Sequence, residues 1–117
     1  MVSDEIWEYR PTAGYRAGVD LVGYRVEATD GHIGKIDKHS DAVGAAHLVV
    51  DTGVWIFGRH VLLPVGTIER IDATTETVYV ARTKEQIRSA PEYDAAKHAG
   101  EPSYLEQFAR HYGQPRM

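Results

Sequence analysis

The sequence predicts a mainly β fold, a small six-stranded antiparallel β-barrel followed by short C-terminal helices. Residues 23–82 contain six short apolar runs separated by turn-forming residues, a pattern typical of all-β domains. The links between these runs are of hairpin length, and closing such strands into a barrel removes the exposed edges of an open sheet. After residue 82 the pattern changes to helix-initiating residues and proline, which indicates short helices.

The first two strands form the clearest local structure. Tyr24, Val26 and Ala28 alternate with polar neighbours, which is the period-2 pattern of a half-buried strand. Asp30-Gly31 follows, and these residue types readily adopt the backbone of a tight hairpin turn. We expect the chain to return through residues 33–37.

Four further strands follow. Residues 47–51 are rich in β-branched side chains and stop at Gly53, as expected of a strand. The run 61–63 ends at Pro64; since proline cannot donate to a sheet ladder, Pro64 marks an edge, a bulge or a strand end. The last two strands are expected at 67–71 and 77–81, joined by a turn over 72–76.

Two capping boxes predict the helices. Thr83 and Gln86 have the spacing at which each satisfies a backbone donor of the other, and Pro91 keeps that helix short. A second box over 103–106 opens a helix whose apolar stripe is Leu105, Phe108 and Tyr112. About ten residues are too few for a stable isolated helix. This helix must therefore dock on its own barrel or on a second copy.

Three regions are expected along the chain: an aromatic arm over 1–19, the barrel domain over 20–94, and a linker with the amphipathic helix over 95–117. No apolar run is long enough to span a bilayer, and the first residues are too charged for a secretory signal. A cytoplasmic location is therefore expected, and the absence of cysteine fits a reducing compartment. The net charge of -4 argues against direct nucleic-acid binding.

The order and spacing of these segments resemble the PRC-barrel family, named after the cytoplasmic domain of the photosynthetic reaction-centre H subunit. The resemblance is carried by residues 23–36, 47–53, 60–66, 68–72 and 78–80 with the helix before Pro91. It implies a six-stranded, mainly antiparallel barrel without catalytic residues, used for assembly or docking. Stand-alone bacterial members are the most similar class; the ribosome maturation factor, whose C-terminal domain is a member, and the H subunit carry segments that this chain lacks.

No pattern in the sequence predicts a catalytic, cofactor or metal site. The six histidines lack the close pairs typical of zinc sites, although strands could bring His47 and His60 together. No serine lies in a nucleophile elbow, and no glycine-rich phosphate loop is present. We therefore expect a protein that is not an enzyme and needs no cofactor.

The segment between the third and fourth strands is the strongest candidate for a contact with a partner. Trp55, Phe57 and Arg59 lie close together there, and exposed aromatic and arginine side chains are favoured in protein interfaces. The alternative is that the aromatic side chains pack into the barrel or under the arm. Leu105, Phe108 and Tyr112 leave the same choice open, between the chain's own core and a dimer interface.

The leading functional hypothesis is a non-catalytic adaptor that binds itself, as a homodimer, and another protein whose identity the sequence does not reveal. A role in ribosome assembly or RNA metabolism and support of an electron-transfer or membrane complex are the alternatives that the family resemblance raises. A metal or small-ligand binder is a further alternative.

Overall fold

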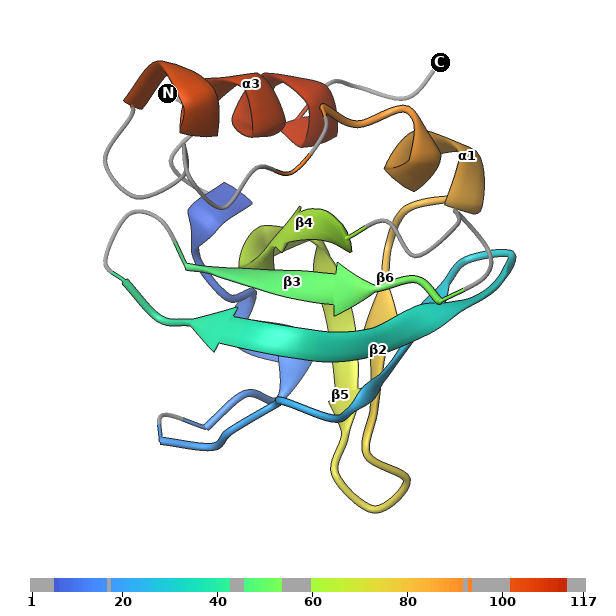
Figure 1. Cartoon of the computed structure of the whole chain (residues 1–117). Helices are drawn as coiled ribbons and strands as arrows, with labels where there is room; N and C mark the ends of the chain where they lie inside the picture. The colour runs from blue at the N-terminus through green and yellow to red at the C-terminus, as the bar shows by residue number, and fades with distance from the viewer. Residues whose placement is uncertain are drawn as a thin grey trace.

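The computed structural model describes residues 6–16, 18–42, 46–53, 60–91, 93 and 102–113. Within them six strands form one sheet in the order β4-β3-β2-β1-β6-β5, so the predicted mainly β fold is confirmed (Figure 1). The strands are β1 (Arg25–Ala28), β2 (Gly31–Ser40), β3 (His47–Asp51), β4 (His60–Pro64), β5 (Ile68–Asp72) and β6 (Thr77–Val80). The helical elements are the 3₁₀ turns η2 (Pro11–Ala13) and η3 (Val65–Thr67) and the α-helices α1 (Lys84–Arg88) and α3 (Pro102–Gly113).

The predicted hairpin is β1 and β2. The side chains of Tyr24, Val26 and Ala28 are buried as their alternation indicates. Ala28 pairs with Gly31, so the two turn residues are Thr29 and Asp30, one position earlier than expected. Gly31 is instead the first residue of the returning strand.

Gly34 allows β2 to approach β3 very closely. A Cβ atom at this position would lie 2.1 Å from the carbonyl oxygen of Asp51, well inside van der Waals contact. The contact is with backbone, which cannot rotate away as a flexible side chain would. Only glycine fits here, and the long strand β2 can therefore bend while it pairs with both β1 and β3.

The expectation of an antiparallel sheet is wrong for one pair of neighbouring strands, because β1 and β6 pair in parallel. All other neighbours are antiparallel. These pairings make β4 and β5 run in the same direction, so the chain does not reverse at η3 as it does at a hairpin. Because the chain does not reverse there, β5 runs antiparallel to β1, and β6, which reverses after β5, runs parallel to β1.

The expected closure into a barrel is also wrong, since the hydrogen-bonded ladder ends at β4 on one edge and at β5 on the other. The two edges nevertheless meet, because only the buried turn η3 separates them in sequence. Val65 N–H donates to the carbonyl of Ala46 beside β3, and Ala81 N–H beside β6 donates to the carbonyl of Thr67, at 3.1 and 2.8 Å. β4 and β5 follow one another across η3 and are not paired with each other. The sheet is thus rolled but keeps an open seam.

Two helices lie together at one end of the rolled sheet (Figure 1). The first is capped as predicted: Thr83 Oγ1 accepts from Gln86 N–H, and the Gln86 side chain accepts from Thr83 N–H. The second, α3, begins at Pro102, so Ser103 lies inside the helix and the prediction that Ser103 caps it is wrong. No helix in the described part of the chain combines the length and apolarity needed to cross a bilayer.

The N-terminal arm packs against the sheet instead of forming a strand. Ile6, Trp7 and Ala13 are buried in the same core as the strands. Arg10 Nε donates to the carbonyl of Gly66 in η3 at 3.0 Å. The arm therefore supports the seam between β4 and β5 and positions the residues that follow it.

Candidate binding site

A polar aromatic cluster fixes the arm to the end of β2. The rings of Tyr9 and Tyr15 are stacked, with centroids 3.8 Å apart and planes 6° from parallel. His39, the ninth residue of the ten-residue strand β2, meets both rings edge-on. Gly14, at φ 87°, lets the chain turn between the two tyrosines.

Asp41 accepts hydrogen bonds from this whole cluster. Its Oδ1 accepts from the Tyr9 hydroxyl at 2.8 Å, and its Oδ2 accepts from the Tyr15 hydroxyl. His39 Nε2 lies 2.9 Å from Oδ1 and 2.6 Å from the Tyr9 hydroxyl. Because Nδ1 of the same ring accepts from Leu21 N–H at 3.4 Å, the ring proton is assigned to Nε2. Each donor in the cluster thus meets an acceptor.

The pKa values of Tyr9, Tyr15 and Asp41 fit a structural role for the cluster of Tyr9, Tyr15, His39 and Asp41, which we call the clamp. Burial and then the hydrogen bond and charge of Asp41 raise the pKa of Tyr9 well above its ordinary value, and the same causes raise the pKa of Tyr15. Burial alone would raise the pKa of Asp41, but hydrogen bonds from Tyr15, Tyr9 and His39 outweigh it and the pKa is lowered. The phenols therefore stay neutral donors and the carboxylate stays an ionised acceptor at neutral pH.

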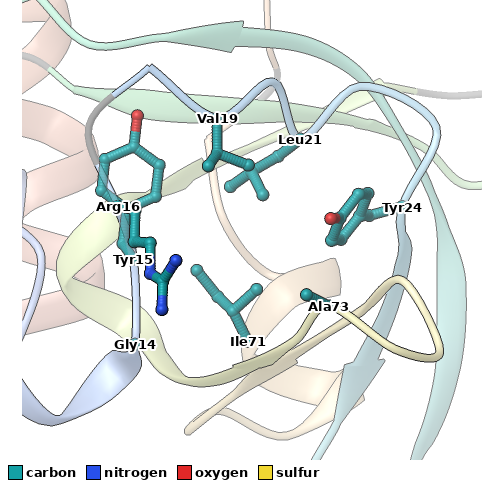
Figure 2. Close-up of a pocket in the computed structure, with 8 residues that line it drawn as sticks. All are labelled: Gly14, Tyr15, Arg16, Val19, Leu21, Tyr24, Ile71 and Ala73. Atoms are coloured by element: carbon teal, nitrogen blue, oxygen red, sulfur yellow. The ribbon is translucent and has the colours of Figure 1, made fainter.

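A pocket of about 400 Å³ opens beside this clamp (Figure 2). Its apolar side is formed by Val19, Leu21, Ile71 and Ala73, and Tyr24 closes it opposite the arm. The walls thus come from the segment before β1 and from β5 with the turn after it. The segments that line it, the chain before β1 and the turn after β5, lie at the end of the sheet away from α1 and α3 (Figure 1).

Two polar groups reach this pocket without a bonding partner in the described part of the chain. The Arg16 guanidinium lies at one side, next to Ile71, and the Tyr24 hydroxyl points toward the centre from the other (Figure 2). Tyr24 as a whole is only 8% exposed, and its hydroxyl is the end of the side chain that faces the pocket. The pocket therefore offers a cation and a hydroxyl across an apolar surface.

The candidate contacts predicted from the sequence lie elsewhere. Trp55, Phe57 and Arg59 fall outside the described residues. Phe108 and Tyr112 are 0% and 1% exposed in the core of their own chain, and Leu105 is half-buried against it. Of the two alternatives for this stripe, the structure has the helix docked on its own sheet, where α3 contacts β4.

The histidines are spread over the fold. The β3–β4 register pairs His47 with Pro64 and His60 with Asp51, so the pair singled out in the sequence lies at opposite ends of these strands. His60 Nε2 lies 3.5 Å from Asp37, and His111 Nε2 lies 2.6 Å from the carbonyl of Gln86. Within the residues that the structure describes, no three histidine or carboxylate side chains gather as a metal site requires.

Sequence reasoning missed the pocket and the clamp. Tyr15, Arg16 and Val19 stand in an arm without periodicity, and Ile71 is more than fifty positions away in the sequence. The available signal was the arm's composition, since aromatic residues interrupted by glycine favour a segment that packs along a surface. Which surface it covers depends on the rolled sheet.

Comparison with known proteins does not assign the chain, because no family model and no curated protein matches it. The PRC-barrel resemblance stays a prediction from the sequence.

Proposed function

We propose that the protein is a non-catalytic, cytoplasmic adaptor module of the PRC-barrel type that binds another protein and acts as a homodimer. The observation that carries the protein-binding part is the position of the exposed apolar side chains. In the described ranges the large hydrophobic residues that remain exposed are Val19 and Val22, at 38% and 48%. Both lie in the loop that forms the pocket.

The outward side chains of the sheet differ sharply from this loop. Arg25 lies 3.7 Å from Glu27, and Arg70 lies 3.8 Å from Asp72 and stacks over the ring of Tyr79 at 4.1 Å. Such partly exposed charges are well solvated and gain little from a partner. The contrast between the charged sheet face and the loop with two exposed valines supports a docking surface at this loop.

The clamp supports a role without catalysis. Its phenols, imidazole and carboxylate hydrogen-bond to one another and thereby hold the arm. A general base or nucleophile needs a pKa near the working pH and access to a substrate. The pKa values of Tyr9 and Tyr15 are raised and that of Asp41 is lowered. All three shifts move the pKa away from neutral pH.

The homodimer part of the proposal rests on the sequence segment with Trp55 and Phe57. The stripe on α3 no longer supports it, because Phe108 and Tyr112 are used in the chain's own core. Light scattering of the full chain over a wide range of concentrations tests this part. Trp55→Ala and Phe57→Ala should lower the dimer fraction, whereas His32→Ala, at an exposed position on β2, should not. A monomer at every concentration contradicts the homodimer.

Selection from a displayed library of protein fragments tests the protein-binding part. The full chain serves as bait, and calorimetry measures the affinity of the selected segments. Val22→Asp should weaken binding by about tenfold or more, because a carboxylate would be desolvated in an apolar interface. Gln107→Asp places the same side chain at an exposed position on α3 and should leave the affinity unchanged. A selection without saturable binders, or equal effects of the two variants, contradicts the proposal.

A further inference from the structure

The Tyr24 hydroxyl is the first anchor that the pocket offers to a ligand. The residue is 8% exposed and its hydroxyl points into the pocket (Figure 2). A phenolic hydroxyl donates one hydrogen bond, and such a bond to a ligand contributes to affinity when the ligand shields it from water. A ligand atom that accepts from Tyr24 therefore replaces water at this hydroxyl.

Arg16 supplies the second anchor. Its side chain is exposed at the side of the pocket and forms no ion pair within the described residues. A guanidinium presents a planar set of donors that matches both oxygens of a carboxylate. The group that would complement this side of the pocket is therefore an anion, and a carboxylate fits the donor geometry.

The size of the pocket limits what lies between these anchors. Its volume of about 400 Å³ is near the lower end of ligand sites, which span roughly 300–1,000 Å³. Val19, Leu21 and Ile71 give it a surface for one branched or aromatic side chain. A large cofactor would not fit, whereas one amino-acid residue with its main-chain groups would.

We infer that this pocket binds the carboxyl-terminal residue of a partner polypeptide when that residue is apolar. The side chain packs between Val19, Leu21 and Ile71, the terminal carboxylate pairs with Arg16, and a main-chain carbonyl accepts from the Tyr24 hydroxyl. This inference rests on the proposed protein-binding function and names the chemistry of the partner.

A terminal residue fits better than an internal acidic one. A carboxyl-terminal leucine or phenylalanine carries the carboxylate and the apolar side chain on the same Cα, so one residue can reach both anchors. An internal aspartate or glutamate places its charge on a different residue from the apolar group. That arrangement needs more of the chain to be ordered, which costs conformational entropy.

Titration of the full chain with short peptides tests the inference. The probes are acetyl-glycyl-glycyl-leucine with a free carboxylate, the same peptide as its carboxamide, and acetyl-glycyl-glycyl-serine. Binding is followed by calorimetry and by backbone amide chemical shifts. We expect the leucine acid to bind about tenfold more tightly than its carboxamide, as removal of a charged hydrogen-bonding partner implies.

Substitutions show whether the two anchors act as assigned. In Arg16→Gln the acid and the carboxamide should bind equally, and Tyr24→Phe should weaken the acid by about threefold to tenfold. Arg25→Gln removes an exposed guanidinium that is paired with Glu27 and serves as the matched control with unchanged affinity. Circular dichroism confirms that each variant is folded.

Several results would overturn the inference. Equal binding of acid and carboxamide to the unaltered chain removes the carboxylate contact with Arg16. If 4-methylpentanoate binds as tightly as the peptide, the site takes small acids and not polypeptide ends. If the peptides do not bind but fragments from the display selection do, this inference fails while the proposed function stands. If neither binds, both fail.

Discussion

The two ends of the rolled sheet are covered by segments from outside the strands, and in the described residues these segments differ in how they meet the core. There the side chains of Phe108 and Tyr112 are fully buried, and Arg82 Nε donates to the carbonyl of Tyr112 at 3.2 Å. At the other end the arm lines a pocket with the exposed Val19 and with the Tyr24 hydroxyl, which points into it. The difference separates a surface that completes the core from one that remains available for a partner.

The helical end should show the largest loss of stability on truncation. Phe108→Ala removes a fully buried aromatic ring and should lower the free energy of unfolding by about 3–5 kcal/mol. Urea denaturation measures the change. Gln107→Ala, on the exposed side of the same helix, should change it by less than about 0.5 kcal/mol. Equal effects would mean that α3 does not dock on the sheet.

The next effect concerns the bond that ties α3 to the end of β6. Arg82→Met removes the donors to the Tyr112 carbonyl and should destabilise the chain by about 1–2 kcal/mol. Hydrogen exchange should then rise mainly in α3. Arg110→Met is the control, since Arg110 lies 3.8 Å from Glu106 in an exposed ion pair that contributes little. Unchanged hydrogen exchange in α3 of Arg82→Met would show that these hydrogen bonds do not hold the helix in place.

A smaller effect is expected at the clamp of the arm. Asp41→Asn weakens the acceptor for Tyr9 and Tyr15 and should cost about 1 kcal/mol, a value reduced because the carboxylate is partly solvated. Amide exchange should rise in residues 9–16 while α3 stays protected. Asp37→Asn, on the exposed part of β2, is the control. Exchange that rises equally over the whole chain would show that the two ends are not independent.

The same clamp should loosen in acid. The pKa of Asp41 is lower in the folded chain than its ordinary value of 3.8. Its hydrogen bonds therefore contribute stability above that value, and the contribution is lost as pH falls through the folded pKa. Amide hydrogen exchange in the arm should rise in the unaltered chain when the pH is lowered. In Asp41→Asn, where the carboxylate is already absent, lowering the pH should cause no additional rise. The same acid dependence in both would contradict the assignment.

The smallest effect is spectroscopic. The folded pKa values of Tyr9 and Tyr15 are raised above the ordinary value of 10.0, so their stabilisation is present below that pH and is lost only as pH rises toward the folded pKa. In an ultraviolet titration these two tyrosines should ionise at higher pH than a solvent-exposed phenol. Tyr9→Phe should shorten that late phase. A single phase near the ordinary value would contradict the buried clamp.

Local patterns predicted the elements of this fold well. The alternation around Val26, the β-branched run at 47–51 and the capping box of Thr83 and Gln86 depend on neighbours close in sequence, and each is confirmed. The apolar stripe with Phe108 predicted a buried face of α3. It could not tell which surface buries that face, because both alternatives need the same residues.

Long-range features were not accessible from the sequence. The parallel β1–β6 pair and the open seam follow from the absence of a chain reversal at η3, and a short turn after Pro64 is equally compatible with a hairpin. The pocket requires Arg16 and Tyr24 to meet Ile71 across the rolled sheet. The local sequence around Arg16 and Tyr24 contains no pattern that predicts their approach to Ile71.

An amide chemical-shift map of the full chain bound to acetyl-glycyl-glycyl-leucine, or to a fragment selected by display, locates the docking surface. We predict shifts concentrated in residues 14–24 and 71–73, with α3 unaffected. Shifts concentrated along α3, between Leu105 and Tyr112, would contradict the account.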